Sequence, residues 1–151
     1  MYKVLFVCHG NICRSPAAEY IFKHLIKENG LEDKISTSSK ATSLEEIGND
    51  IYPPMKRTLF NHGIKFNRHY ASKMSLKDYK ENDIIFVMDY NNVRNISYIV
   101  NDVDKKIFLL REYVGLPGIV DDPWYNDKFD ECYQSIYEAL ERLIVKIKKE
   151  I

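Results

Sequence analysis

Two short apolar runs, Val4–Cys8 and Ile84–Met88, stand out along the chain, and each leads into polar residues and then into a helical pattern. Continuous apolar runs of this length are typical of strands that are buried on both faces of a parallel sheet. Ile35–Ser39 and Ile107–Leu110 predict two further strands. Because strands alternate with helical segments, the pattern predicts an α/β fold with a mainly parallel sheet, in which ligands bind at the carboxyl ends of the strands.

Capping signals delimit the helices. Ser15–Pro16 resembles an N-cap followed by proline at the first helical position, and Asn29–Gly30 ends that helix. Glu112–Tyr125 contains two glycines and two prolines, which predicts a long loop. Further helices are predicted within Asp50–Asn61, with Pro53–Pro54 as the start, for about ten residues after Asn92, and from Asp127 to the end of the chain.

Length and charge narrow the possible functions. A chain of 151 residues with 45% hydrophobic content predicts a single domain spanning residues 1–151. Lys+Arg and Asp+Glu both number 22, so nothing in the overall charge predicts nucleic acid or an anionic membrane as a partner. No apolar run approaches the roughly 18 residues of a membrane helix, and no signal-peptide pattern begins the chain. We therefore expect a cytoplasmic protein that binds any anion through a local arrangement.

The segment Cys8–Ser15, which we call the phosphate loop, joins the first predicted strand to the first predicted helix. The residues between Cys8 and Arg14 suffice to curl a loop whose amide N–H groups converge on one centre. Such a nest, in front of a helix N-terminus, binds a tetrahedral oxyanion and stabilises a thiolate. Arg14 adds a planar fork of donors that can bind two oxygens of a phosphate at once.

These features predict that Cys8 attacks phosphorus through a phosphocysteine intermediate. The alternative is a buried structural cysteine beside an unrelated arginine. The apolar strand, Gly10 within the loop and the helix start at Ser15–Pro16 all favour the first interpretation. The three cysteines lack the spacing of a zinc site, so we expect no metal.

The run from Val4 to Glu19 resembles the signature of the low-molecular-weight protein tyrosine phosphatases, and the similarity continues in order along almost the whole chain. The resemblance implies a three-layer, doubly wound, four-stranded parallel sheet of order 2-1-3-4, with helices on both faces and the phosphate loop between the first strand and the first helix. The further matching segments are Ser39–Gly48, Asn61–Ile64, Met88–Asp89 with Asn92, and Asp121–Tyr125.

The resemblance also implies roles for individual residues, without a metal or a cofactor. Cys8 would be the nucleophile, Arg14 the phosphate clamp, and Asp122 the general acid and base, with Asp121 as its competitor. Asn11, Ser15 and Ser39 would hold the phosphate loop in shape, and Ser15 would also hydrogen-bond the Cys8 thiolate. His69 and Asp89 would support it, with His62 and His69 expected to make hydrogen bonds near Asp89. The residues expected to contact phosphate or substrate are His9, Gly10, Asn11, Ile12, Cys13, Ser15, Trp124 and Tyr125.

Two cysteines outside the nucleophile position have separate interpretations. Cys13 follows Cys8 closely enough that oxidation could join their sulfurs, which the family resemblance also implies. The alternative for Cys13 is a small apolar residue packed under the loop. Cys132 lies on the apolar face of the last helix and is expected in the core.

The resemblance implies a phosphotyrosine phosphatase that acts on phosphotyrosine proteins or aryl phosphates, is inhibited by inorganic phosphate or other tetrahedral oxyanions, and is a monomer or weak dimer. Arsenate reduction and dephosphorylation of arginine are alternatives on the same fold, and an inactive phosphotyrosine-binding module is an alternative of another class. Ile12 favours phosphotyrosine, because the arginine-specific relatives tend to carry threonine there. Glu45 or Glu46 stands where many relatives have a tryptophan on the pocket rim, which puts the peptide preference in doubt.

Overall fold

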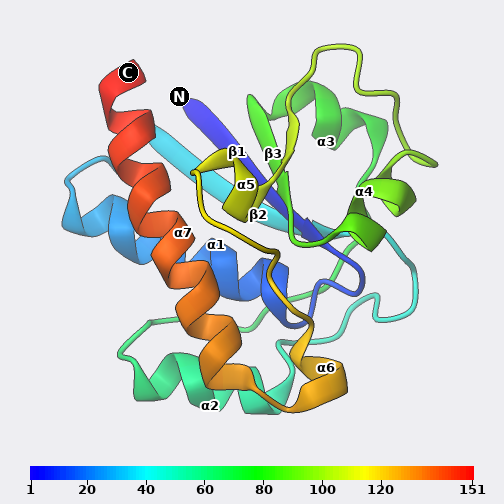
Figure 1. Cartoon of the computed structure of the whole chain (residues 1–151), viewed down its shortest axis with the longest axis vertical. Helices are drawn as coiled ribbons and strands as arrows, with labels where there is room; N and C mark the ends of the chain where they lie inside the picture. The colour runs from blue at the N-terminus through cyan, green and yellow to red at the C-terminus, as the bar shows by residue number, and fades with distance from the viewer.

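The structure is a computed structural model that describes residues 1–151, and it is built around a four-stranded parallel sheet (Figure 1). The strand order is β2-β1-β3-β4, so the predicted α/β class and the order 2-1-3-4 are confirmed. The strands are β1 (Tyr2–Cys8), β2 (Ile35–Ala41), β3 (Ile84–Val87) and β4 (Ile107–Leu109).

Helices cover both faces of the sheet, as Figure 1 shows. One face carries α1, α2 and α7, with α7 packed against α1 and α2, and the other carries α3 and α4. None of the helices is long and apolar enough to cross a membrane. The helices are α1 (Arg14–Glu28), α2 (Pro53–Asn61), α3 (Leu76–Glu81), α4 (Tyr90–Ile96), α5 (Leu110–Tyr113), α6 (Pro123–Asn126) and α7 (Phe129–Glu150).

The apolar run of β1 serves both layers because successive side chains of a strand point to opposite faces. Val4 and Phe6 belong to the large core beneath α1 and α7, whereas Leu5 and Val7 belong to the smaller core beneath α3 and α4. Phe6 is fully buried and meets Phe22 of α1 edge-on, with 5.7 Å between the ring centroids. Burial of such a side chain contributes about 1.5–3 kcal/mol, so β1 is the central support of the fold.

The candidate site residues Cys8 and Asp89 lie at the carboxyl ends of the strands. Cys8 ends β1 and pairs in register with Ala41 at the end of β2, and the Thr42 amide donates to the Cys8 carbonyl at 2.9 Å. Asp89 follows β3 and caps α4. The parallel strands therefore deliver the phosphate loop and Asp89 to one edge of the sheet, as expected for this class of fold.

The start of α1 differs from the prediction. Cys13, and not Ser15, occupies the N-cap, and the helix begins at Arg14 without a side-chain cap. Ser15 is unavailable as a cap because its hydroxyl contacts Cys8, Asn11 and the Lys40 carbonyl. The first turn of the helix is thus shaped by the phosphate loop.

Several other predicted boundaries are also wrong. The predicted loop Glu112–Tyr125 contains the end of α5 and most of α6, because Asp122 and Pro123 start a single turn too short to show periodicity. The capping box of Ser75 and Asp78 that begins α3 was missed for the same reason. Leu110, predicted in a strand, begins α5, while α4 has 7 residues and α7 begins at Phe129. The predicted start of α2 at Pro53–Pro54 is confirmed.

Candidate active site

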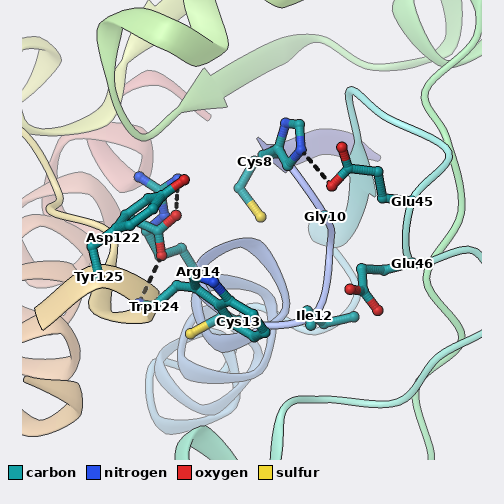
Figure 2. Close-up of a pocket in the computed structure, with 11 residues that line it drawn as sticks. Cys8, Gly10, Ile12, Cys13, Arg14, Glu45, Glu46, Asp122, Trp124 and Tyr125 are labelled. Atoms are coloured by element: carbon teal, nitrogen blue, oxygen red, sulfur yellow. Dashed lines mark hydrogen bonds and ion pairs between the residues drawn. The ribbon is translucent and has the colours of Figure 1, made fainter. Parts of the chain in front are cut away.

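A cavity of about 270 Å³ opens in front of the phosphate loop (Figure 2). Of the residues expected from the sequence to contact phosphate or substrate, all line this cavity except Asn11 and Ser15, which are buried within the loop and face away from the cavity lining. The cavity is lined by Cys8, His9, Gly10, Ile12, Cys13, Arg14, Glu45, Glu46, Asp122, Trp124 and Tyr125.

The Cys8 thiol is buried at the end of β1 and points into the cavity (Figure 2). Its sulfur lies 2.9 Å from Ser15 Oγ and 3.4 Å from the Ser15 backbone nitrogen. The Asn11 amide donates to the Ser15 hydroxyl oxygen at 2.8 Å, so the Ser15 proton is free to point at the sulfur. Two donors from one residue therefore stabilise negative charge on Cys8.

Asn11 holds the phosphate loop from behind. It is fully buried and adopts a left-handed backbone with φ of 60°, a conformation that few residues other than glycine and asparagine accept. Its side-chain amide also donates to Ser39 Oγ at 2.9 Å, and its side-chain oxygen accepts from the Ser72 amide at 3.2 Å. The His69 ring donates from Nε2 to the Asn11 carbonyl at 2.7 Å, which fixes the tautomer of that histidine.

The Arg14 guanidinium is buried at the side of the cavity. Both of its hydrogen bonds to the protein use Nη1, which donates to Asp89 Oδ2 at 2.7 Å and to the Val120 carbonyl at 2.9 Å. Burial by itself lowers the pKa of Arg14, but the negative charges of Cys8, Asp122 and Asp89 outweigh burial and raise that pKa. The group stays charged, and its Nε and Nη2 make no hydrogen bond to the protein, although Nη2 lies 3.5 Å from the Asp122 carboxylate.

Asp122 lies across the cavity from Cys8. Its Oδ1 accepts from the Trp124 amide at 3.0 Å and caps α6, and its Oδ2 lies 3.5 Å from Arg14 Nη2. Its competitor, Asp121, does not line this cavity and borders a separate small hollow beside Cys132. Only Asp122 of the pair therefore faces the thiol-bearing pocket.

Two aromatic side chains form the wall on the Asp122 side (Figure 2). Trp124 is half exposed and packs against Tyr52, with 4.9 Å between the ring centroids. Tyr125 projects into solvent with 85% of its surface exposed. A flat apolar wall of this kind suits an aromatic ring that enters the cavity.

The other two thiols have environments unlike that of Cys8. Burial raises the pKa of Cys13 well above its ordinary value, and nearby negative groups raise it further. Burial likewise raises the pKa of Cys132 to about 12, and Cys132 lies in the large core. Both thiols are therefore protonated at neutral pH.

His69 supports the phosphate loop through Asn11, but the hydrogen bonds predicted for His62 and His69 near Asp89 are absent, and several supporting groups were not predicted. Neither His62 nor His69 contacts Asp89, because His62 Nε2 lies 3.1 Å from Asp130 on α7 and His69 supports Asn11. Buried Glu19 accepts a hydrogen bond from Ser39 Oγ at 2.7 Å. The sequence offered one signal for this supporting role, which is an acidic residue on the inner face of a helix. The structure has no cluster of three or more His, Cys, Asp or Glu side chains arranged to hold a metal ion.

Residues 3–151 match the family model described as low molecular weight phosphotyrosine protein phosphatase. A protein of that name from Schizosaccharomyces pombe is 38% identical over 96% of each chain. The crystal structure of YfkJ from Bacillus subtilis, at 37% identity, superposes with a TM-score of 0.94 over 99% of this chain and 96% of that one. The arginine phosphatase YwlE, also from Bacillus subtilis, is 28% identical, with a TM-score of 0.87 over 97% of this chain and 96% of that one.

The family match covers the phosphate loop, the loop that carries Asp122 and nearly every residue between and beyond them. This match and the similarity to curated relatives agree with the geometry of the cavity. The protein belongs to the low molecular weight phosphotyrosine protein phosphatase family.

Proposed function

We propose that the protein hydrolyses phosphotyrosine in proteins through a phosphocysteine intermediate formed on Cys8. The observation that carries the proposal is the convergence of three groups on one cavity. The Cys8 sulfur, the unused donors of Arg14 and the Asp122 carboxylate all border a space that is walled by aromatic side chains. Nucleophile, phosphate clamp and acid are the three parts that such a transfer needs.

In the first step, the thiolate of Cys8 attacks phosphorus and the bond from phosphorus to the tyrosyl oxygen breaks. Asp122, protonated at this stage, gives its proton to the departing oxygen, so tyrosine leaves as a neutral phenol. Arg14 and the loop amides bind the equatorial oxygens, whose charge they stabilise throughout the transfer.

In the second step, water attacks the phosphocysteine and the sulfur to phosphorus bond breaks. Asp122, now a carboxylate, takes a proton from that water and is ready for the next cycle. Ser15 lies 2.9 Å from the sulfur and stabilises the thiolate as it leaves. The products are inorganic phosphate and the free enzyme, so phosphate and other tetrahedral oxyanions are expected as competitive inhibitors.

A phosphoarginine phosphatase is the second candidate. It is favoured by the similarity to YwlE and by the carboxylates of Glu45 and Glu46 on the cavity wall, which could attract a guanidinium. The apolar side chain of Ile12 and the wall of Trp124 favour an aromatic phosphate ester instead. We therefore propose phosphotyrosine, and not phosphoarginine, as the substrate.

The test is a panel of peptides of one sequence that carry phosphotyrosine, phosphoserine or phosphoarginine at the same position. We expect the phosphotyrosine peptide to have the highest kcat/KM, measured by phosphate release. Cys8→Ser should lower turnover by about a thousandfold or more while retaining phosphate binding, because the cradle survives without its nucleophile. Cys132→Ser makes the same atomic change outside the cavity and should keep its activity.

Near-normal activity of Cys8→Ser would refute the phosphocysteine scheme. Equal rates on all three peptides would refute the tyrosine assignment, and the highest rate on phosphoarginine would establish the second candidate.

A further inference from the structure

The cavity has one acidic wall, made by Glu45 and Glu46, which we call the acidic rim. Figure 2 shows the acidic rim across the mouth of the cavity from Trp124, Tyr125 and Asp122. A site that accepts a phosphate dianion gains nothing for the phosphate itself from two carboxylates at its entrance, since like charges repel. The acidic rim therefore serves some other part of a substrate.

Local contacts hold each rim carboxylate in place. Glu46 Oε2 accepts from the Asn49 side chain at 2.6 Å, and Glu46 Cγ lies so close to Gly10 that a Cβ at that position would approach it to 3.3 Å. The Glu46 stem thus rests directly on the phosphate loop. Glu45 Oε2 lies 3.0 Å from His9 Nε2, also on the loop.

The segment that carries the acidic rim is itself tied to the phosphate loop. The Ser43 amide and hydroxyl both donate to the His9 carbonyl, at 3.1 and 3.0 Å. Beyond the rim, the Gly48 amide donates to the Ala71 carbonyl at 2.8 Å. The backbone that carries the two carboxylates is therefore fixed beside the phosphate loop, which limits the entropy lost when a partner binds them.

Neither rim carboxylate has a permanent cation as a partner. No Lys or Arg nitrogen lies within 4.0 Å of Glu45 or Glu46, and the single ion pair of Glu45 is with His9, where both side chains are well exposed. Arg14, the cation of the cavity, is already flanked by Asp89 and Asp122. The acidic rim therefore offers two carboxylates to a positive group that arrives from outside.

We propose that Glu45 and Glu46 select phosphotyrosine segments that carry arginine or lysine next to the phosphotyrosine, and that they disfavour acidic neighbours. The inference rests on the proposed function. With the phosphotyrosine ring inside the cavity, the residues beside it in the substrate lie at the mouth, because an extended chain advances only about 3.3–3.6 Å per residue. An arginine there can bind a carboxylate with two parallel hydrogen bonds, and an acidic residue is repelled.

The experiment compares kcat/KM for three phosphotyrosine peptides that differ only in arginine, alanine or glutamate flanking the phosphotyrosine. Exposed ion pairs change an equilibrium by about two- to fivefold each. We therefore expect the basic peptide to exceed the acidic one by about tenfold at low salt, and the ratio to shrink as salt is added. The ratio within one protein cancels any change in catalytic rate that is common to both peptides.

Glu45→Gln and Glu46→Gln keep side-chain size and remove one charge each. Each should lower the ratio of basic to acidic peptide by about threefold, and the double variant should bring it close to one. Glu32→Gln removes an exposed carboxylate that does not line the cavity, so it should leave the ratio unchanged.

A ratio that stays the same in the double variant, or a native enzyme that treats the three peptides alike, would overturn the inference while leaving the proposed function intact. Failure of the native enzyme to release phosphate from any of the three, the alanine peptide included, would instead refute the proposed function.

Discussion

Three cysteines of one chain acquire different chemistry from their immediate surroundings. Ser15 supplies the Cys8 sulfur with a hydroxyl at 2.9 Å and an amide at 3.4 Å. Burial without such donors raises the pKa of both Cys13 and Cys132. A thiolate is the nucleophilic form of cysteine, so the neighbours of Cys8, and not the residue type alone, support its proposed role.

At the scale of single residues, Asp122→Asn should slow the hydrolysis of a phosphotyrosine peptide by about a hundredfold. The reason is that the tyrosyl oxygen is a poor leaving group without a proton. An activated aryl phosphate such as para-nitrophenyl phosphate leaves more readily as an anion and should lose much less. Steady-state kinetics on both substrates measure the difference. Asp121→Asn is the matched control and should change neither rate greatly, since Asp121 lies outside the cavity. An equal loss on both substrates in Asp122→Asn would reassign the acid.

At the scale of elements, the phosphate loop is held by partners from distant parts of the sequence. Ser39 of β2, the Ser72 amide and the His69 ring all bind Asn11, and Glu19 of α1 in turn binds Ser39. Asp89 links a further element, since one carboxylate oxygen caps α4 through the Asn92 amide while the other binds Arg14. The loop therefore keeps its strained shape because surrounding elements fix it.

Two replacements of Asn11 should separate the energetic cost of backbone strain from the contribution of the side-chain hydrogen bonds to stability. Asn11→Ala loses the buried hydrogen bonds and also leaves at φ of 60° a residue that tolerates the left-handed conformation less well than asparagine, so we expect a loss of about 2–4 kcal/mol in the free energy of unfolding. Asn11→Gly loses the same bonds without the strain and should be about 1 kcal/mol more stable than Asn11→Ala. Denaturant unfolding measures both values. Equal stability of the two variants would argue against a backbone penalty at this position.

At the scale of the whole molecule, Asp50 joins α2 to the segment around His69, whose ring supports the phosphate loop. Its carboxylate binds Lys56 of α2 and the His69 amide, and it lies 3.3 Å from Arg68. Burial alone would raise the pKa of Asp50, but hydrogen bonds from Lys56, the amides of His69 and Ile51, and Arg68 hold that pKa well below its usual range. Ionised Asp50 therefore stabilises the folded chain.

The sign of the pH dependence follows from that lowered pKa. Stability from Asp50 is fully present above the unfolded value of about 3.9 and is lost as the pH falls below it toward the folded value. Asp50→Asn should be less stable than the native protein at pH 7, and this difference should shrink on acidification to about pH 3. Thermal unfolding across this range tests the prediction, with exposed Asp33→Asn as the control. A difference that stays constant with pH would contradict it.

Some features of the protein follow from the sequence by itself. The strands, the long last helix and the phosphate loop could be predicted because their signals are local: β1 and β3 are short apolar runs, and Cys8 through Ser15 is contiguous. The order of the sheet came from the family resemblance. Proximity along the chain therefore sufficed to propose the nucleophile, cradle and clamp together.

Tertiary structure decided the features that depend on distant partners. It directed His69 to the Asn11 carbonyl, and Asp122 rather than Asp121 to the cavity. It also placed both Glu45 and Glu46, and not one of the two, on the cavity wall without a Lys or Arg partner. Sequence periodicity reports which face of an element is buried, but the orientation of a polar side chain depends on which donors and charges the fold brings within about 3 Å of it.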